Sequence, residues 1–276
     1  MLKQRVITAA ILIPIVLWGI LGLSTLPAFG LALGVFVVLG VFEWIRLIKF
    51  ESSSSQQYSY VALIVMSMIA SLALMQSDFL FFLFLSISVA WWLVQISQLH
   101  SYTGETGVDQ SKSLQHLWSG AMLLVPTWAS LIFIHQDASN GPQLVLFLMI
   151  LIWTADSGAY FSGRKFGKNK LMPLVSPGKT KEGAYGAFVA SAIVAVIGGF
   201  WLELGFFQFV FFILLSMVVV VFSIGGDLLE SVYKRKAEMK DSGTLLPGHG
   251  GVLDRIDSLM SASPAFALGI WLLGII

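Results

Sequence analysis

Residues 206–227 read FFQFVFFILLSMVVVVFSIGGD, and they are followed by a charged segment at 228–257 and a second apolar run at 258–276. A transmembrane helix needs about 20 consecutive apolar residues, so both runs are long enough to cross a bilayer. The same alternation extends over the rest of this 276-residue chain, in which 57% of residues are hydrophobic and only 11% are charged. A soluble domain carries about 25% charged residues. The composition therefore predicts a membrane protein.

Hydropathy predicts an all-α, polytopic fold with about nine transmembrane helices. The first apolar run follows a basic N-terminus and resembles a signal peptide, but it is too long and no small-residue cleavage site precedes the next run, so we interpret it as an uncleaved helix. The longest polar stretch, 98–116, is interpreted as a connecting loop. The chain has no cysteine, which excludes disulfides and thiolate metal ligands. The predicted spans are 6–25, 27–47, 60–76, 79–97, 118–135, 143–162, 184–203, 206–227 and 258–276.

The positions of the cations predict the orientation in the membrane. When the connections are numbered alternately from the N-terminus, all 16 Lys and Arg residues fall on one side. Cytoplasmic loops carry the excess of Lys and Arg, so we expect a cytoplasmic N-terminus and, after an odd number of spans, a C-terminus outside. The two most basic loops, 163–183 and 228–257, then face the cytoplasm together.

Two polar stripes are predicted at this cytoplasmic face. If the helix of 206–227 continues, polar residues recur at i, i+3, i+4 and i+7, and the start of the last span repeats this spacing. Hard oxygen ligands at this density suit Mg²⁺. The alternative is that the acids only cap helices or pair with neighbouring Lys and Arg residues. The stripes are Asp227, Glu230, Ser231 and Lys234 in the first helix, and Asp254, Asp257, Ser258 and Ser261 in the second.

A glycine-rich turn, Pro247-Gly248-His249-Gly250-Gly251, lies between the stripes. Its glycines permit close backbone approach, so that N–H groups can cradle an anion, and His249 can donate to a phosphate. Such a turn is weak evidence alone, because many are only loops. Its neighbours give it weight here.

The other basic loop contains Ser176-Pro177-Gly178-Lys179-Thr180. A Walker A loop needs a further glycine five residues before Gly178, where this chain has Pro173, so it is not a P-loop. Lys179 and Thr180 can still bind phosphates by the same chemistry. The alternative for the cations around them is that they only set topology or contact anionic lipid.

Two acids lie inside predicted spans. Asp156 is near the cytoplasmic end of the sixth span, and an intramembrane acid is a functional candidate by default. Small residues around it also permit close helix packing, so part of its role can be structural. Glu43, near the same end of the second span, is interpreted as the partner of Arg46 one turn later.

These residues indicate phosphoryl or nucleotidyl transfer involving a lipid. The run from Ser231 to Asp257 resembles the motif of the CTP:phosphatidate cytidylyltransferases (CDP-diacylglycerol synthases), with Tyr233 as a mild departure, and the resemblance extends to 226–231, 156–160 and 176–180. CTP-dependent lipid kinases of the polyprenol type share parts of it and are the alternative. A secondary transporter is less favoured, because the charges gather at one face and no repeat is found.

The resemblance implies transfer of the cytidylyl group of CTP to phosphatidate, with release of pyrophosphate. Mg²⁺ would be held by Asp227 and Asp254, and a second, monovalent cation such as K⁺ is allowed. Substrate-binding residues would be Asp156, Ser176, Lys179, Thr180, Gly250 and Gly251. The other catalytic candidates, which neutralise phosphates or support the metal site, are Lys234, Arg235, Lys240, Asp241, His249, Arg255 and Asp257.

The resemblance also implies where the protein works and with what. We expect an integral protein of the inner membrane of a bacterium, with its site on the cytoplasmic face and a homodimeric assembly. The bilayer is its environment and no nucleic acid is expected as a partner. Residues 1–140 would wall a lipid cavity or form oligomer contacts, and 141–276 would form the catalytic region.

Overall fold

The computed structural model describes residues 2–50, 52–245, 248 and 250–276, and within these ranges the chain forms nine α-helices. The predicted all-α architecture and the predicted number of helices are therefore confirmed, whereas the crossing of the membrane by all nine stays a prediction. Single turns of π- or 3₁₀-helix occur at Thr25–Phe29, Leu99–Ser101 and Gln110–Lys112. The helices are α1 (Leu2–Gly22), α2 (Gly30–Leu47), α3 (Ser54–Leu74), α4 (Asp78–Gln98), α5 (Ser113–His135), α6 (Gly141–Phe166), α7 (Lys181–Trp201), α8 (Phe206–Lys236) and α9 (Leu253–Leu272).

Seven helical segments of the described chain, which contain α2 to α8, are long and apolar enough to cross a membrane. The part of α1 that qualifies as apolar, Ala10–Gly22, is shorter. The α9 helix is not among the seven, and its first half is rich in charged and small polar residues. Helix α8 does not stop at Asp227 but continues to Lys236, as the first polar stripe requires.

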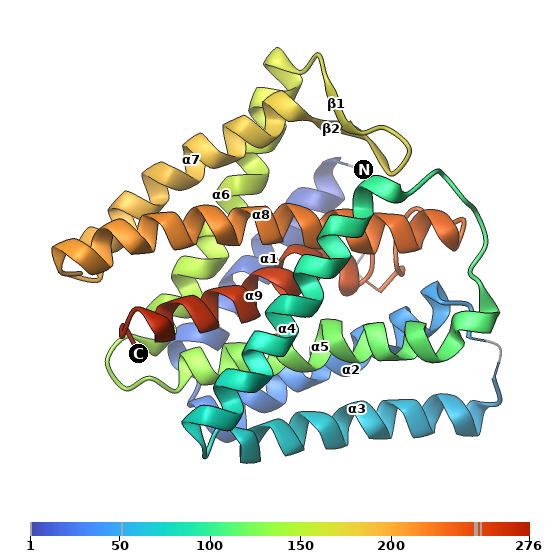
Figure 1. Ribbon diagram of the computed structural model, residues 1–276, viewed down its shortest axis with the longest axis horizontal. Helices are drawn as coiled ribbons and strands as arrows, with labels where there is room; N and C mark the ends of the chain where they lie inside the picture. The colour runs from blue at the N-terminus through green and yellow to red at the C-terminus, as the bar shows by residue number, and fades with distance from the viewer. Residues whose placement is uncertain (1, 51, 246–247, 249) are drawn as a thin grey trace.

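Helices α8 and α9 cross the middle of the molecule (Figure 1). In that view α7 lies above them, and α2, α3 and α5 lie below them. The most extensive packing joins α6 to α7, α8 to α9, and α5 to α9. Helix α9 is buried without interruption from Ser258 to Ala267, so it forms part of the centre of the protein.

The outer helices bury only one stripe each. In α3 the buried residues are Tyr60, Ile64, Met68 and Ser71, which recur every three or four positions, while Leu63, Met66 and Ile69 are exposed. A helix that is apolar all round but buried on one side matches a lipid environment. The exposed apolar surface is thus what a membrane would cover.

Close approach between helices depends on glycine at two places that matter for the site. A side chain at Gly158 of α6 would lie 2.7 Å from the carbonyl oxygen of Gly186 in α7. A side chain at Gly226 of α8 would lie 2.5 Å from the carbonyl oxygen of Asp257 in α9. The second approach brings the two predicted polar stripes side by side.

Residues 163–183, one of the two basic loops expected at the cytoplasmic face, contain regular structure between α6 and α7. They contain a two-stranded antiparallel hairpin of β1 (Lys170–Met172) and β2 (Ser176–Thr180), in which Lys170 pairs with Thr180 and Met172 with Ser176. The hairpin is held to α7 by Glu182, which accepts a hydrogen bond from Asn169 Nδ2 at 2.7 Å and one from the Lys168 amide at 3.1 Å. Lys179 is therefore presented from a short ordered strand.

Candidate active site

A cavity of about 490 Å³ lies between α6, the β-hairpin, α7 and α8. Five residues that the sequence singled out for substrate or metal binding line it: Asp156, Ser176, Lys179, Thr180 and Asp227. They come from three different elements, α6, β2 and α8, so only the tertiary packing brings them together. The cavity wall also includes the basic side chain of Arg164 and two residues without side chains, Gly163 and Gly178.

An ion pair crosses this cavity from the hairpin to α8. The Nζ atom of Lys179 lies 2.6 Å from Oδ2 of Asp227, and the two side chains are 27% and 28% exposed. Ser231, one turn further along α8, donates a hydrogen bond to Oδ1 of Asp227 at 3.3 Å. The base expected to bind phosphate and the acid expected to bind metal therefore meet directly.

Thr180 has a structural role in addition to lining the cavity. It is buried, and its Oγ1 accepts a hydrogen bond from the amide of Gly183 at 3.1 Å. This contact caps the N-terminus of α7, where the first amides of a helix have no partner within the helix. The cap fixes the end of β2 and with it the position of Lys179.

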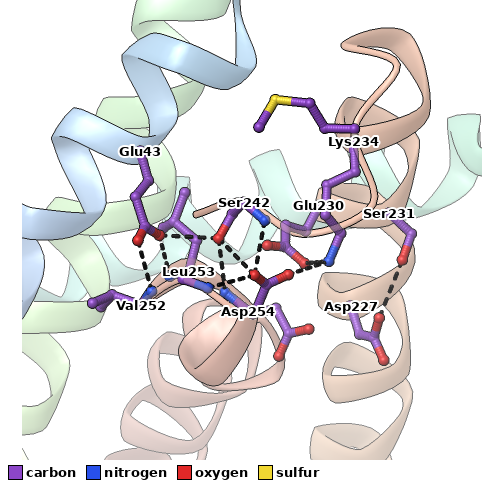
Figure 2. Close-up of polar contacts among 12 residues, drawn as sticks. Glu43, Asp227, Glu230, Ser231, Lys234, Ser242, Val252, Leu253 and Asp254 are labelled. Carbon is purple, nitrogen blue, oxygen red and sulfur yellow. Dashed lines mark hydrogen bonds and ion pairs between the residues drawn. The ribbon is translucent and has the colours of Figure 1, made fainter. Parts of the chain in front are cut away.

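A second group of charges surrounds Asp254 and is shown in Figure 2. Lys234 of α8 lies between two carboxylates, 2.7 Å from Oδ1 of Asp254 and 2.5 Å from Oε2 of Glu230. The other oxygen of Asp254, Oδ2, accepts from the amides of Ser242 and Gly251, each at 2.8 Å. Lys234 is buried, so in this structure it neutralises protein carboxylates.

Hydrogen bonding decides the protonation of Asp254, which precedes the apolar part of α9. Burial alone would raise the pKa of this carboxyl. The ammonium group of Lys234 and the amides of Gly251 and Ser242 outweigh burial and hold the pKa below its ordinary value. Asp254 is therefore ionised at neutral pH.

The carboxylates near the cavity outnumber the ammonium groups paired with them, and in the described part of the chain no three His, Asp or Glu side chains lie together as metal ligands. Among the described residues, Asp227, Glu230 and Asp254 form ion pairs with Lys179 and Lys234 only, and Asp257 lies within electrostatic range of Asp227 and Glu230. Four acids thus face two ammonium groups. In addition, Oε1 of Glu230 is buried without a hydrogen-bond partner in the described part of the chain. In this structure the ammonium groups of Lys179 and Lys234 contact Asp227 and Asp254, and so take the positions beside these carboxylates that a bound cation would take.

The remaining predicted residues have varied positions. Arg235 donates to the backbone oxygens of Val175 (3.1 Å) and Met239 (3.4 Å), so it ties the end of α8 to the hairpin. A side chain at Gly250, where φ is +81°, would lie 2.5 Å from Oδ2 of Asp254. Gly250 and Gly251 therefore both contact Asp254 closely. Lys240, Asp241 and Arg255 are exposed, and His249 lies outside the described residues.

The interpretation of Glu43 was wrong. Its carboxylate does not pair with Arg46 in the described structure, because α2 buries Glu43 and exposes Arg46. It accepts hydrogen bonds from the amides of Val252 and Leu253 (both 2.9 Å) and lies 3.0 Å from the hydroxyl of Ser242. Ser242 was not considered from the sequence. An acid inside an apolar helix was the only signal, and its partners lie about 200 positions away.

The chain matches the cytidylyltransferase family over residues 3–273. It belongs to this family. Phosphatidate cytidylyltransferase of Pseudomonas aeruginosa is 41% identical over 275 residues, which cover 99% of this chain and 98% of that protein. The phosphatidate cytidylyltransferase of Haemophilus influenzae is 37% identical over 97% of this chain and 98% of its own length. That of Bacillus subtilis is 42% identical over 45% of this chain and 46% of its own length.

Proposed function

We propose that this cytidylyltransferase-family protein transfers the cytidylyl group of CTP to phosphatidate, giving CDP-diacylglycerol and pyrophosphate for phospholipid synthesis. The observation that carries the proposal is the meeting of Lys179 and Asp227 in one cavity with Asp156 and Ser176. Full-length similarity to two phosphatidate cytidylyltransferases supports the same substrates.

The reaction needs charge neutralisation more than a strong base. A phosphate monoester has a second pKa of about 6, so the phosphate of phosphatidate is already an anionic nucleophile at neutral pH. One of its oxygens attacks the α-phosphorus of CTP and forms a new P–O bond. The bond from the α-phosphorus to the oxygen bridging to the β-phosphorus breaks, and its electron pair leaves with pyrophosphate. Lys179, on strand β2 of the hairpin, would bind the triphosphate and offset its repulsion by the Asp227 carboxylate.

A second cavity supports a lipid substrate. It has a volume of about 660 Å³ and is lined mainly by apolar side chains, among them Ile96, Phe188 and Val221. It shares Leu171, Ala184 and Ile224 with the polar cavity. Acyl chains lying in this cavity would place a lipid phosphate beside Lys179 while the chains stay in an apolar environment.

The acidic cluster would hold Mg²⁺, with Asp227 and Asp254 as the principal residues and Asp257 in support. When bound, the metal would stabilise negative charge on the phosphates and on the leaving pyrophosphate. The excess of carboxylates over ammonium groups supports this proposal, and it leaves room for a monovalent cation such as K⁺. Lys234 keeps Glu230 and Asp254 oriented within the cluster.

The distribution of cations supports an orientation with the N-terminus in the cytoplasm and the C-terminus outside. The β-hairpin and the end of α8 then lie at the cytoplasmic face, where CTP is available. We place the protein in the inner membrane of a bacterium, as a homodimer. Residues 141–276 would supply the catalytic region, and 1–140 the walls of the lipid cavity or the dimer contacts.

The experiment measures pyrophosphate release by the purified protein in mixed micelles with Mg²⁺. The substrate pairs are phosphatidate with CTP, phosphatidate with ATP, and diacylglycerol with CTP. Release that needs both phosphatidate and CTP, with CDP-diacylglycerol as product, is the expected result. Formation of CDP and a phosphorylated lipid alcohol without pyrophosphate would instead assign the protein to the CTP-dependent lipid kinases. Folded protein that is inactive with every pair would refute both enzymatic functions.

A further inference from the structure

A buried acid of the N-terminal half reaches the start of α9. Glu43 lies in α2, is only 6% exposed, and points at the first turn of α9 (Figure 2). The amides at the start of a helix have no partner within it and carry partial positive charge. The residue preceding α9, Val252, provides no side-chain cap. Glu43 supplies that cap from another helix, through 2.9 Å contacts to the amides of Val252 and Leu253.

The backbone around this carboxylate leaves no room for a side chain. A Cβ atom added at Gly243 would collide with Oε1 of Glu43, and one added at Gly251 would collide with both Glu43 oxygens and with Oγ of Ser242. The two glycines therefore allow the segment to close around Glu43. The fit holds residues 242–243 and 251–253 against α2.

A single hydroxyl links Glu43 to Asp254. Oγ of Ser242 lies 3.0 Å from Oε2 of Glu43 and 2.9 Å from Oδ2 of Asp254. A serine hydroxyl carries one proton, so it donates to Glu43 or to Asp254 at any moment, and its position between the two oxygens ties their positions together. The amides of Ser242 and Gly251 hold the same Oδ2 atom. Among the described residues, the donors to Oδ2 are therefore Ser242 and Gly251, which flank the contacts that Glu43 makes.

We infer that Glu43 is a positioning residue, which fixes Asp254 through Ser242 and the start of α9 without touching substrate. The inference rests on the proposed function, in which Asp254 belongs to the reacting site. Lys234 orients Oδ1 of Asp254 from α8, and Glu43 orients Oδ2 from α2. The N-terminal helices therefore contribute to the geometry of the site in addition to forming its walls.

The test compares Glu43→Gln with Glu203→Gln, the same substitution at an exposed acid between α7 and α8. The amide keeps the size of the side chain but replaces one acceptor oxygen by a donor, which faces either a backbone N–H or the Ser242 region. Displacement of a reacting group by about 1 Å can cost about 100-fold in rate. We expect Glu43→Gln to lower kcat about 10- to 100-fold per folded molecule with KM for CTP changed less than about threefold, and Glu203→Gln to match the wild type.

A double-mutant cycle with Ser242→Ala separates positioning from general destabilisation. If Glu43 acts through Ser242, the loss of kcat in the double variant is smaller than the product of the two single losses. Losses that multiply, or a loss of activity that only follows the loss of folded protein, would overturn the inference. Should Glu43→Gln not fold, Ser242→Ala decides alone, because unchanged kcat in that folded variant contradicts the link.

Hydrogen exchange supplies a readout that does not depend on activity. In Glu43→Gln one of the two amides, that of Val252 or that of Leu253, loses its acceptor, so the peptide covering 250–256 should exchange faster than in the wild type and in Glu203→Gln. Equal exchange in all three proteins would overturn the inference. A wild-type protein without pyrophosphate release would refute the proposed function separately, and the exchange experiment would still report on the anchor.

Discussion

Replacement of Lys179 by Met tests the cavity most directly. Lys179 projects from β2 into the cavity, and its Nζ atom lies 2.6 Å from Asp227. Met keeps the length and the apolar stem of the side chain and removes only the charge. Activity falls for two reasons, because the triphosphate loses a neutralising cation and the unpaired Asp227 carboxylate then repels the triphosphate.

The size of the expected loss in kcat/KM follows from how exposed the side chains of Lys179 and Asp227 are. Two unit charges about 4 Å apart interact by about 1 kcal/mol in bulk water and by about 4 kcal/mol at the effective dielectric of a protein surface. The side chains of Lys179 and Asp227 are 27% and 28% exposed, which places the site between these limits. An intermediate value of about 2 kcal/mol corresponds to about 30-fold in rate, and the upper limit to about 1,000-fold. We expect kcat/KM for CTP to fall within this range.

The assay is pyrophosphate release with phosphatidate and CTP at saturating Mg²⁺, normalised to folded protein. Lys181→Met is the matched control, because Lys181 carries the same charge two residues later and is exposed. Its backbone contact, from the Lys181 amide to the oxygen of Asn169, survives the substitution. If Lys179→Met keeps a kcat/KM within about twofold of Lys181→Met, Lys179 does not neutralise the substrate and the site has been assigned to the wrong cavity.

Three further predictions follow from the same geometry. Asp227→Asn and Asp254→Asn should each lower turnover by orders of magnitude in protein that still folds, whereas Lys112→Ala, at an exposed residue of the 3₁₀ turn Gln110–Lys112 that does not line the polar cavity, should be nearly silent; near-normal turnover in either acid variant contradicts the metal proposal. EDTA should abolish pyrophosphate release and added Mg²⁺ should restore it, and activity that persists in EDTA argues against a divalent cation. Gly158→Ala should destabilise the protein by about 1–3 kcal/mol and so lower its melting temperature in detergent, because the added Cβ would meet the Gly186 carbonyl. Gly19→Ala, where an added Cβ has no atom within 4 Å, should leave the melting temperature unchanged, and equal melting temperatures of the two variants would contradict the close α6–α7 contact.

Local sequence patterns were sufficient to predict much of this protein. The apolar runs predicted nine helices, because the length of a spanning helix depends only on consecutive residues and on bilayer thickness. The helical period placed Glu230 and Lys234 on one face, and their ion pair at four residues' separation is present in the structure. That stripe required the helix to continue past Asp227, which was left as a condition, and α8 extends to Lys236. These properties involve neighbours along the chain.

The contacts that build the site were decided by packing. Lys179 reaches Asp227 only because the hairpin folds over α8, and no spacing in the sequence reports that approach. The second partner of Lys234, Asp254, lies on another helix. Sequence reasoning assigned Glu43 to its nearest cation, Arg46, because it could count only residues on the same helix. The structure turns Glu43 inwards to α9, where glycines at 243 and 251 leave space for a carboxylate.

The sequence by itself determined the membrane class, the helices and the chemical types of the site residues, since hydropathy, period and motif are properties of adjacent positions. Only the tertiary structure decided which charges meet. A buried carboxylate is stabilised by whichever donors converge on it in space. For Glu43 and Asp254 those donors are backbone amides and one serine hydroxyl of a segment that two glycines allow to close between α2, α8 and α9.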